Sequence, residues 1–401
     1  MPHTTFFLSI NDTPIAENDA IWNRTLPITP HEVVHPEASG RESAITYGAY
    51  FTAIRRFIER DRFSILTRAI RDRTGQTVAA RDLGTINISL EKHGHFYHPA
   101  RLTVDADGRQ LYFVVNVAVT TIGRTYIQND FANIRSLNHR YPYQFLPRVY
   151  SSGSELLPDG SHRVVLFIGQ WLDGYHEFHL SGMPAEGNDR LLVWDSLKGA
   201  HRLSEQVRSE VYRRAAQILT AYYNLETFEQ IFSWHHAAGD FVVKTEGQHV
   251  KVRLITVRKY APLFDGTGTD AQTIIQALLI FLLNLTVKMR LDRLDGMGAM
   301  TWAGDAAVTA TLDGFFDGLF LQVYSDRIPA ELPDLFAAYL KALTAVDLND
   351  MFAAVFERTF SQTFERKMIR KHIKHHGDTL HKAIGRLPSY KGVNPNMKCM
   401  D

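Results

Sequence analysis

Hydrophobic positions recur at helical spacing in the N-terminal part of the chain. Residues 43–73 read SAITYGAYFTAIRRFIERDRFSILTRAIRDR, and apolar side chains return there every three or four residues. This spacing predicts one or two amphipathic helices. Residues 1–40 contain several prolines and no such period, so we expect them to be irregular. The pattern therefore predicts an N-terminal extension over residues 1–80, irregular at first and then helical.

A period of two replaces the helical spacing from about residue 84. His93-Gly94 and Asp107-Gly108 are turn signals between extended runs. The predicted elements are strands near 85–92, 95–104 and 110–119, a helix over 126–142, an extended segment at 145–153, and an apolar strand within 163–180 that leads into a turn at Asp173-Gly174. Three strands, a helix and two strands predict a small antiparallel sheet with one helix against it, over residues 81–175.

Helical periodicity returns after about residue 180. Residues 203–225 form an amphipathic stripe, and Ser204 is a plausible N-cap. Residues 241–257, FVVKTEGQHVKVRLITV, predict a short hairpin, and four to six further helices are expected between 270 and 387. The predicted fold class is α+β, with a mostly helical second part over residues 176–401.

Composition restricts the classes of protein that fit. The 401 residues are 45% hydrophobic, which is enough for a sizeable core and two or three domains. A net charge of +1 provides no overall field for nucleic acid or an acidic membrane. The single cysteine, Cys399, excludes an intrachain disulfide framework and suits a reducing cytoplasm. The most apolar segment, 274–287, is shorter than the ~20 residues that span a bilayer, so we expect a buried helix in a soluble, cytoplasmic protein.

The order of elements, together with three stretches, resembles the kinase-like fold, and within it the aminoglycoside phosphotransferase and choline kinase group. Residues 129–153 look like the group's first-lobe helix and the strand after it, and VVLFIGQWLDGYHE (164–177) looks like the strand and hinge under an adenine. Residues 231–257 look like the catalytic loop and metal-binding hairpin. The resemblance covers residues 84–345 and implies a two-lobe protein-kinase-like fold that uses ATP and Mg²⁺.

Phosphoryl transfer requires a lysine on the phosphates, oxygen ligands for Mg²⁺ and a base near the acceptor. The resemblance implies that the lysine should lie on the third strand, where Asn116 or Val115 stands instead. It also implies a hinge at Trp171, Asp173 and Gly174, which would contact the nucleotide together with Asn116.

The catalytic loop aligns with the family pattern in two registers. If GDF is the anchor, Asp240 is the base, and Thr245 stands where a metal-binding Asn is expected. If the hairpin is the anchor, Asp240 is the metal ligand and His235 takes the base position. Thr256 then stands where a second metal-binding Asp is expected. We favour the second register, because the strand at Phe241 has to begin directly after the metal ligand.

Three further residues belong to this candidate site. His235 and His236 are candidate bases, because an imidazole of near-neutral pKa accepts a hydroxyl proton well. Alternatively, both are loop residues that satisfy backbone groups. Asp265 is the nearest carboxylate after the hairpin and is the second candidate metal ligand beside Asp240. The first turn holds one glycine, Gly94, where a glycine-rich loop would cover the phosphates.

Histidines also gather near the C-terminal end of the chain, at His372, His375, His376 and His381. Helical spacing would place His372 beside His376, as in some zinc sites. The surrounding lysines and arginines oppose a bound cation, and Gly377 weakens the helix at that point. We therefore favour a solvated basic face over a metal site.

Two main functional hypotheses follow, and they leave open whether the chain is an enzyme; a third is a metal-dependent enzyme or regulator that uses the cluster from His372 to His381. In the first, it is a divergent kinase-like phosphotransferase with an eroded or rewired site around His235, His236 and Asp240, acting on a small hydroxyl compound. A small molecule or nucleotide would then bind in the cleft between the lobes. In the second, it is a catalytically inactive, pseudokinase-like binding or scaffold protein with a protein partner. Neither hypothesis involves nucleic acid or a membrane.

Overall fold

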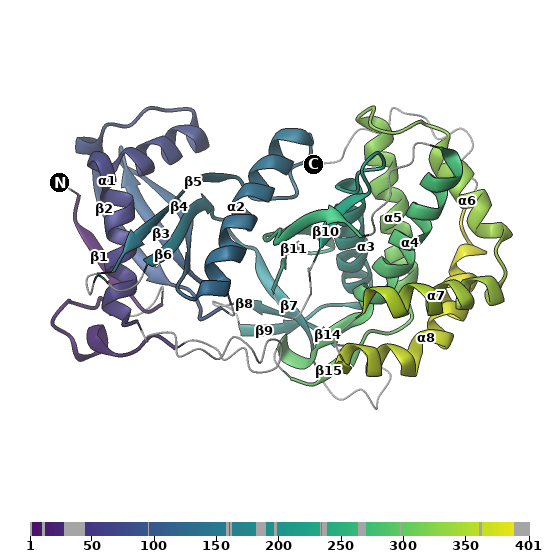
Figure 1. Ribbon diagram of the computed structural model, residues 1–401. Helices are drawn as coiled ribbons and strands as arrows, with labels where there is room; N and C mark the ends of the chain where they lie inside the picture. The colour runs from purple at the N-terminus through teal and green to yellow at the C-terminus, as the bar shows by residue number, and fades with distance from the viewer. Residues whose placement is uncertain are drawn as a thin grey trace. The chain divides into compact units, whose positions relative to one another are not determined.

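The structure is a computed structural model that describes residues 2–9, 13–27, 45–94, 96–157, 160, 163–181, 190–195, 199–232, 234, 239–263, 270–296, 298–360 and 363–388. The chain divides into two compact units (Figure 1). Unit 1 comprises Met1–Arg140 and Leu146–Asp173, and unit 2 comprises Tyr141–Phe145 and Gly174–Asp401. The architecture is mixed α+β, as the sequence predicts.

Unit 1 is built on a six-stranded sheet with the order β1-β2-β3-β4-β6-β5. Its strands are β1 (Thr4–Phe7), β2 (Leu83–Leu90), β3 (His98–Ala106), β4 (Arg109–Ala118), β5 (Val149–Leu156) and β6 (Arg163–Gln170). All neighbouring strands are antiparallel except β1, which runs parallel to β2. Helix α2 (Thr121–Arg140) connects β4 to β5. The predicted order of three strands, a helix and two strands is confirmed.

The predicted N-terminal helical segment is α1 (Tyr47–Thr74), which bends at residues 60–63 where the backbone leaves the helical region. The Thr46 side chain caps its start by accepting from the Ala49 amide. Buried residues of α1, including Phe51 and Phe57, join one apolar core with the sheet. This core takes every second residue of β4 and β6, and α2 lies against the alternate residues Ala118, Val165 and Phe167. The two helices therefore cover opposite faces of the sheet (Figure 1).

The segment predicted as an N-terminal extension shares its core with the sheet. Strand β1 extends the sheet beside β2, and the Phe6 ring lies 5.2 Å from the Trp22 ring and 5.3 Å from the Phe51 ring. Short 3-10 helices lie at Ala20–Asn23, Ala80–Asp82 and, in unit 2, Leu294–Gly296. Residues before α1 therefore contribute to the same core as β2.

Unit 2 contains a five-stranded sheet with the order β12-β11-β7-β8-β9. Its strands are β7 (His176–Ser181), β8 (Arg190–Asp195), β9 (Gly199–Arg202), β11 (Phe241–Glu246) and β12 (His249–Leu254). The predicted hairpin is confirmed as β11–β12, and Gly247 takes a φ of +62° at its turn. Strands β8 and β9 were not predicted. Both are short; β8 pairs with β7, and β9 pairs with β8.

The remaining part of unit 2 is mostly helical, as predicted. Its helices are α3 (Glu205–Ala221), α4 (Ala271–Arg290), α5 (Ala306–Tyr324), α6 (Leu332–Ala342), α7 (Ala345–Thr359) and α8 (Thr363–Ile384). Two small antiparallel pairs join β10 (Glu229–Phe232) to β13 (Lys259–Pro262) and β14 (Leu291–Arg293) to β15 (Met300–Trp302). Ser204 caps α3 by accepting from the Val207 amide, as expected. Helices α3 and α5 pack closely at Gly314. A Cβ at that position would overlap the Arg213 carbonyl oxygen of α3.

Helix α4 is the apolar segment that the sequence predicts to be a core helix. Among the described residues it is the one helix long and apolar enough to cross a membrane by length and composition, and 61% of that apolar window is buried inside the protein. Leu278, Leu282 and Leu283 are fully buried. This burial is what the core helix of a soluble protein requires.

Replacing Phe57 by Ala tests whether α1 stabilises the sheet of unit 1. Phe57 is fully buried, and a Cβ on Gly153 of β5 would lie 2.9 Å from its ring. We expect Phe57→Ala to cost about 3–5 kcal/mol of unfolding free energy, because it leaves a cavity between α1 and β5. The measurement is native-state hydrogen exchange at the amides of β4 and β6. The exposed Arg68→Ala on the same helix is the control, with an expected change within about 0.5 kcal/mol. Unchanged protection in Phe57→Ala would show that α1 adds no stability to the sheet.

Candidate functional site

Asp240 is a predicted site residue whose side chain is fully enclosed by the protein. It lies directly before β11, and none of its side chain is exposed. Both carboxylate oxygens accept hydrogen bonds from the Arg258 guanidinium, Oδ2 at 2.7 Å and Oδ1 at 2.6 Å. Oδ1 also accepts from the Thr256 hydroxyl at 2.8 Å. A bidentate hydrogen-bonded pair between an arginine and a carboxylate is among the stronger polar contacts in proteins.

The local chain path brings these three residues together. Strand β12 ends at Leu254, and the next amide, that of Ile255, donates to the Asp240 carbonyl oxygen at 2.8 Å. Residues 255–258 then run past Asp240 before β13 begins at Lys259 and pairs with β10. Gly239 precedes Asp240 with a φ of +65°, a conformation that favours glycine. A Cβ at that position would also lie 2.7 Å from a carboxylate oxygen of Glu177.

The structure sets Asp240 and Thr256 side by side, and these are the two positions that the hairpin-anchored register assigns to metal ligands. His235, His236 and Asp265 lie outside the described residues. Trp234, which is described, is buried and packs edge-on against Phe241 at 5.8 Å. The described core of the candidate site is therefore Asp240, Thr256 and Arg258.

These three residues do not form a suitable Mg²⁺ site. Mg²⁺ prefers an octahedral set of carboxylate, carbonyl and water oxygens. Both Asp240 oxygens instead accept from a guanidinium, which is a permanent cation, and Thr256 offers a neutral hydroxyl that already donates to Asp240. In the described part of the chain, no three His, Cys, Asp or Glu side chains gather where they could hold a metal ion. The charge of Asp240 is thus neutralised by the protein itself.

Arg258 is the residue of this site that the sequence interpretation missed. It is 7% exposed on its side chain, and it takes the place beside Asp240 where a bound cation was expected. Its partner lies 18 positions earlier in the chain. Nothing periodic links the two positions, because residues 255–258 are irregular. No sequence signal of the kind used above would have identified the pair.

Asn116, predicted at the lysine position, lies in β4 opposite Pro99 of β3 and Phe167 of β6. Strand β4 contains no lysine, and its one arginine, Arg109, is its first residue. A positively charged side chain, that of Arg101, does lie on the adjacent strand β3. Arg101 of β3 pairs with Val114, and residues 114 and 116 point to the same face of the sheet.

Arg101 is a second residue that the sequence interpretation missed. Its guanidinium lies over the Tyr112 ring at 4.4 Å and over the Trp171 ring at 5.2 Å. Burial raises the pKa of the Glu91 carboxyl, and the positive charge of Arg101 partly opposes that rise. The turn at Asp107-Gly108 was a usable signal for this position. A two-residue turn sets residue 101 opposite 114 and residue 99 opposite 116.

The predicted hinge residues occupy the turn between β6 and β7. Trp171 and Asp173 belong to unit 1, whereas Gly174 begins the main part of unit 2. Gly174 has a φ of +73°, and a Cβ there would lie 3.2 Å from Nζ of Lys244. Asp173-Gly174 is thus a turn, as predicted, and the Trp171 ring is already covered by Arg101.

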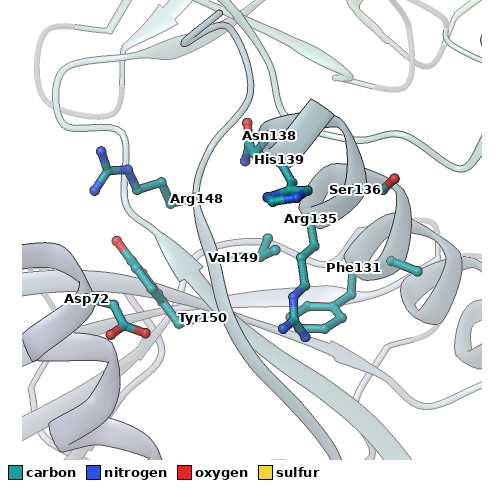
Figure 2. A pocket seen from close by; sticks show the side chains of 10 residues that line it. Asp72, Phe131, Arg135, Ser136, Asn138, His139, Arg148, Val149 and Tyr150 are labelled. Carbon is teal, nitrogen blue, oxygen red and sulfur yellow. The ribbon is translucent and has the colours of Figure 1, made fainter. Parts of the chain in front are cut away.

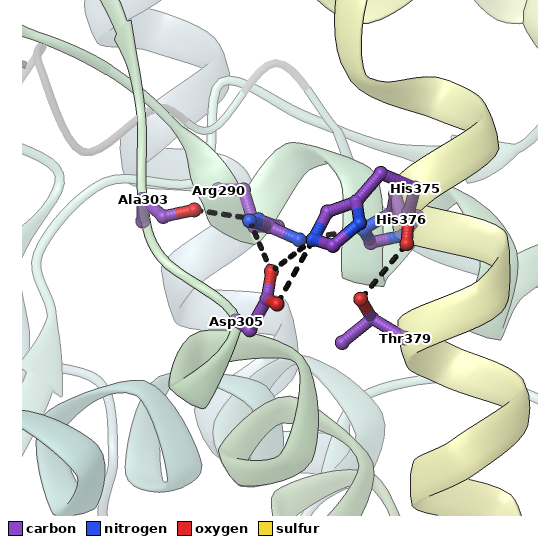
Figure 3. Close-up of polar contacts among 6 residues, drawn as sticks. All are labelled: Arg290, Ala303, Asp305, His375, His376 and Thr379. Carbon is purple, nitrogen blue, oxygen red and sulfur yellow. Dashed lines mark hydrogen bonds and ion pairs between the residues drawn. The ribbon is translucent and has the colours of Figure 1, made fainter. Parts of the chain in front are cut away.

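Two of the C-terminal histidines, His375 and His376, lie beside Arg290 and Asp305 (Figure 3). His376 is fully buried, with Nε2 3.1 Å from the Thr286 hydroxyl and Nδ1 3.4 Å from a guanidinium nitrogen of Arg290. His375 contacts the Asp305 carboxylate at 2.9 Å, and His372 stacks on the Trp302 ring. Arg290 also donates to Asp305 at 3.0 Å, and the His376 ring lies 5.7 Å from the Trp302 ring, so these histidines share one network of polar and ring contacts.

The predicted solvated basic face is therefore wrong for His376. Helix α8 turns this residue toward α4 and α7, where its ring packs 5.0 Å from the Phe352 ring. Gly377 does not end the helix. A Cβ there would overlap the side-chain oxygen of Asn349 in α7, so glycine lets the two helices approach closely.

Comparison with protein-family models gives no match for this chain, and comparison with curated proteins gives no significant match. The functional interpretation consequently depends on the contacts of the residues described above.

Replacing Asp240 by Ala tests the buried ion pair. Arg258 would keep its charge with its acceptor removed, and breaking a buried pair in this way costs about 3–5 kcal/mol. We expect Asp240→Leu/Arg258→Leu to cost less than Asp240→Ala, because no uncompensated charge is then buried. Urea denaturation at pH 7 measures both. The control is Glu246→Ala in the same hairpin, whose exposed contact with Lys244 at 3.4 Å is worth at most about 1 kcal/mol. An Asp240→Ala cost no larger than the control's would contradict the argument.

Acid should destabilise unit 2 through His376. Burial, aided by the nearby charges of Arg290 and His375, lowers the pKa of His376 well below its usual 6.5. The unfolded chain takes up a proton there as the pH falls through about 6.5, whereas the folded chain does not, so stability declines below that pH by up to ~1.4 kcal/mol per pH unit. Unfolding free energies from pH 7.5 to 4.5 should fall less steeply in His376→Gln than in the wild type. His249→Gln, at an exposed position of the hairpin, is the control. Equal slopes in wild type and His376→Gln would contradict the prediction.

Proposed function

We propose that this chain is a pseudokinase-like binding protein that does not carry out Mg²⁺-dependent phosphoryl transfer. The observation that carries the proposal is the Arg258 guanidinium on both oxygens of the buried Asp240 carboxylate. In this proposal Arg258 substitutes for the metal ion that a kinase-like site would need beside Asp240.

The order and pairing of the elements support a kinase-like fold. In unit 1, a sheet of three antiparallel strands continues through a helix into two further strands, as the resemblance implies. In unit 2, α3 is followed by β10, the loop before Asp240, the β11–β12 hairpin and β13. The hairpin brings Asp240 to Thr256, as expected if the two positions descend from a pair of metal ligands.

The energetics oppose recruitment of a metal by Asp240. A divalent ion would have to displace Arg258, which would then lose a charge-assisted contact in a site where it is 7% exposed. Such a loss is worth several kcal/mol. The ion would gain one carboxylate and a neutral threonine oxygen in return. Kinases use an Asp and an Asn to hold the two Mg²⁺ ions, whereas here the second position offers only a threonine hydroxyl.

Unit 1 supports the same conclusion. The lysine that would cradle the phosphates is replaced by Asn116, and the nearby cation Arg101 is engaged with Tyr112 and Trp171. A nucleotide or another small molecule could still bind by aromatic and charged contacts without metal. We further propose that the protein acts in the cytoplasm through such a ligand or a protein partner, because its lone cysteine suits a reducing compartment.

Metal-dependent stabilisation distinguishes this proposal from the rewired-enzyme hypothesis. Thermal unfolding is measured with ATP or ADP, with and without Mg²⁺ or Mn²⁺, and with each metal alone. Since a ligand that binds the folded state raises its stability by mass action, we expect no metal-dependent shift in the wild type. Thr256→Asp/Arg258→Ala should gain one, because two adjacent carboxylates without a guanidinium repel each other and attract a divalent cation.

The single variants Thr256→Asp and Arg258→Ala are the matched controls, and Asp240→Asn in the double variant should abolish the gained shift. A metal-dependent nucleotide shift in the wild type that Asp240→Asn removes would overturn the proposal and favour an active phosphotransferase.

A further inference from the structure

A cavity of about 840 Å³ lies within unit 1, at the end of α2 and the start of β5. Figure 2 shows Arg148 and Tyr150 on one side of β5, and Phe131 and Val149 on the other. Because the strand separates the polar side chains from the apolar ones, one small ligand cannot contact both groups. Side chains with reactive chemistry lie close together instead in unit 2, around Lys288.

Lys288 and Glu365 are two ionisable side chains of unit 2 that are only half-buried. Lys288 lies in the last turn of α4, and Glu365 lies in the first turn of α8. Among the described residues, neither the Lys288 ammonium nor the Glu365 carboxyl has a hydrogen-bond or ion-pair partner. Their polar atoms are also not among the fully enclosed atoms of the described chain that lack a partner. A small molecule can therefore reach both groups.

Two aromatic rings lie beside the Lys288 ammonium. Nζ is 5.4 Å from the centre of the Phe232 ring and 5.9 Å from that of the Trp234 ring. Phe232 is half-buried and Trp234 is buried. Aromatic faces attract a cation, but they do not replace the hydrogen bonds that an ammonium makes to water or to a carboxylate. The same rings offer an apolar surface to a molecule bound at Nζ.

This environment favours the uncharged forms of both groups. Burial lowers the pKa of Lys288 below the usual value for lysine, although the charge of Glu365 opposes that change. Burial raises the pKa of Glu365, and the charges of Lys288 and Arg293 oppose that rise. More of the lysine is thus a free amine, and more of the glutamate is a protonated acid, than at exposed positions. A free amine is a nucleophile, and a neighbouring acid can donate a proton to a leaving group.

Stabilisation of α4 does not explain this arrangement. A cation in the last turn of a helix is favourable, because the carbonyl end carries partial negative charge. An exposed lysine would serve that purpose without the cost of desolvation. Arg290, in the same turn, also pairs with Asp305 and donates to the Ala303 carbonyl oxygen. Helix stability therefore gives no reason to hold the Lys288 ammonium beside aromatic rings.

We propose that Lys288 forms an imine with a small aldehyde or ketone, with Glu365 as proton donor and the Phe232 ring against the apolar part of the compound. The Nζ lone pair attacks the carbonyl carbon, and one proton passes from nitrogen to the carbonyl oxygen. Glu365 then protonates the resulting hydroxyl, the C–O bond breaks and water leaves. The nitrogen lone pair forms the C=N bond, so the protonated imine faces the Glu365 carboxylate.

Lys259 provides an internal comparison for this site. It is exposed, it lies opposite Phe232 in the β10–β13 pair, and its Nζ is 5.6 Å from the same ring. Exposure alone would make Lys259 the more reactive amine. Faster reaction at Lys288 would therefore reflect its environment. The site depends only on contacts within unit 2 and is independent of the kinase-like interpretation.

The test is reductive trapping on the full chain. The protein is incubated at pH 7 with a limiting amount of propanal and with cyanoborohydride, which reduces an imine to a stable amine, and mass spectrometry of the digest locates the modified lysines. We expect Lys288 to react at least about threefold faster than Lys259, because lowering a pKa by one unit raises the free-amine fraction about tenfold and reduces nucleophilicity by less. Reaction at Lys288 that is no faster than at Lys259 overturns the proposal.

Lys288→Met checks that the fast reaction belongs to this amine. The variant should remain folded by circular dichroism, because an unbranched apolar side chain replaces one without a polar partner in the described residues. The fast phase of trapping should be absent from it. A fast phase that persists in Lys288→Met would place the reaction at another lysine and refute the assignment.

Glu365→Gln separates the proton donor from the nucleophile. Acetic anhydride acylates a free amine without the loss of water that imine formation requires. We expect Lys288 of this variant to be acylated as fast as in the wild type or faster, because the charge of Glu365 raises the pKa of Lys288. Trapping with propanal should instead slow several-fold. Glu331→Gln, at an exposed position, should change neither rate. Equal slowing of both reactions in Glu365→Gln would refute its role as proton donor.

Discussion

The contact between Asp240 and Arg258 is the constraint on which the second unit depends. Burying a carboxylate or a guanidinium alone is very unfavourable, and the pair is tolerated only because the two charges and their hydrogen bonds compensate each other. The pair also joins the start of β11 to the segment between β12 and β13. The charge balance of Asp240 and Arg258 is thus coupled to the path of the backbone between β12 and β13. A change at either residue alters both the electrostatics of the loop and the route of the chain after the hairpin.

For the proposed function, this coupling gives a physical reason why a kinase-like framework would be kept without metal chemistry. A carboxylate that loses its cation needs another, or it must be removed. Arginine suits this role because its guanidinium stays protonated and can meet both oxygens of one carboxylate. Once such a pair is buried, the site no longer gains from a divalent ion.

The sequence predicted those helices and strands whose signals lie within a few neighbouring residues. The alternation of residues 85–119 and the turn at Asp107-Gly108 were sufficient for β2, β3 and β4, and the cap at Ser204 identified the start of α3. Strands β8 and β9 were missed because each is short, and each pairs with the strand that directly precedes it in the chain. The packing of α1 onto the sheet was missed for a related reason. An amphipathic pattern shows which face of a helix is buried, but not what buries it.

The residues of the candidate site also differ in how well the sequence predicts them. Asp240 was found because a short motif precedes a hairpin, whereas Arg258 depends on a long-range contact that leaves no periodic trace. Arg101 is intermediate, since the register of a two-residue turn places it on the Asn116 face of the sheet. In both units an arginine stands close to a position where kinase-like chemistry would require another group, and each one is already engaged, Arg258 by a carboxylate and Arg101 by aromatic rings. Random loss of catalytic groups would leave uncompensated partners. The described site has compensated ones, which is the arrangement that the proposed binding function predicts.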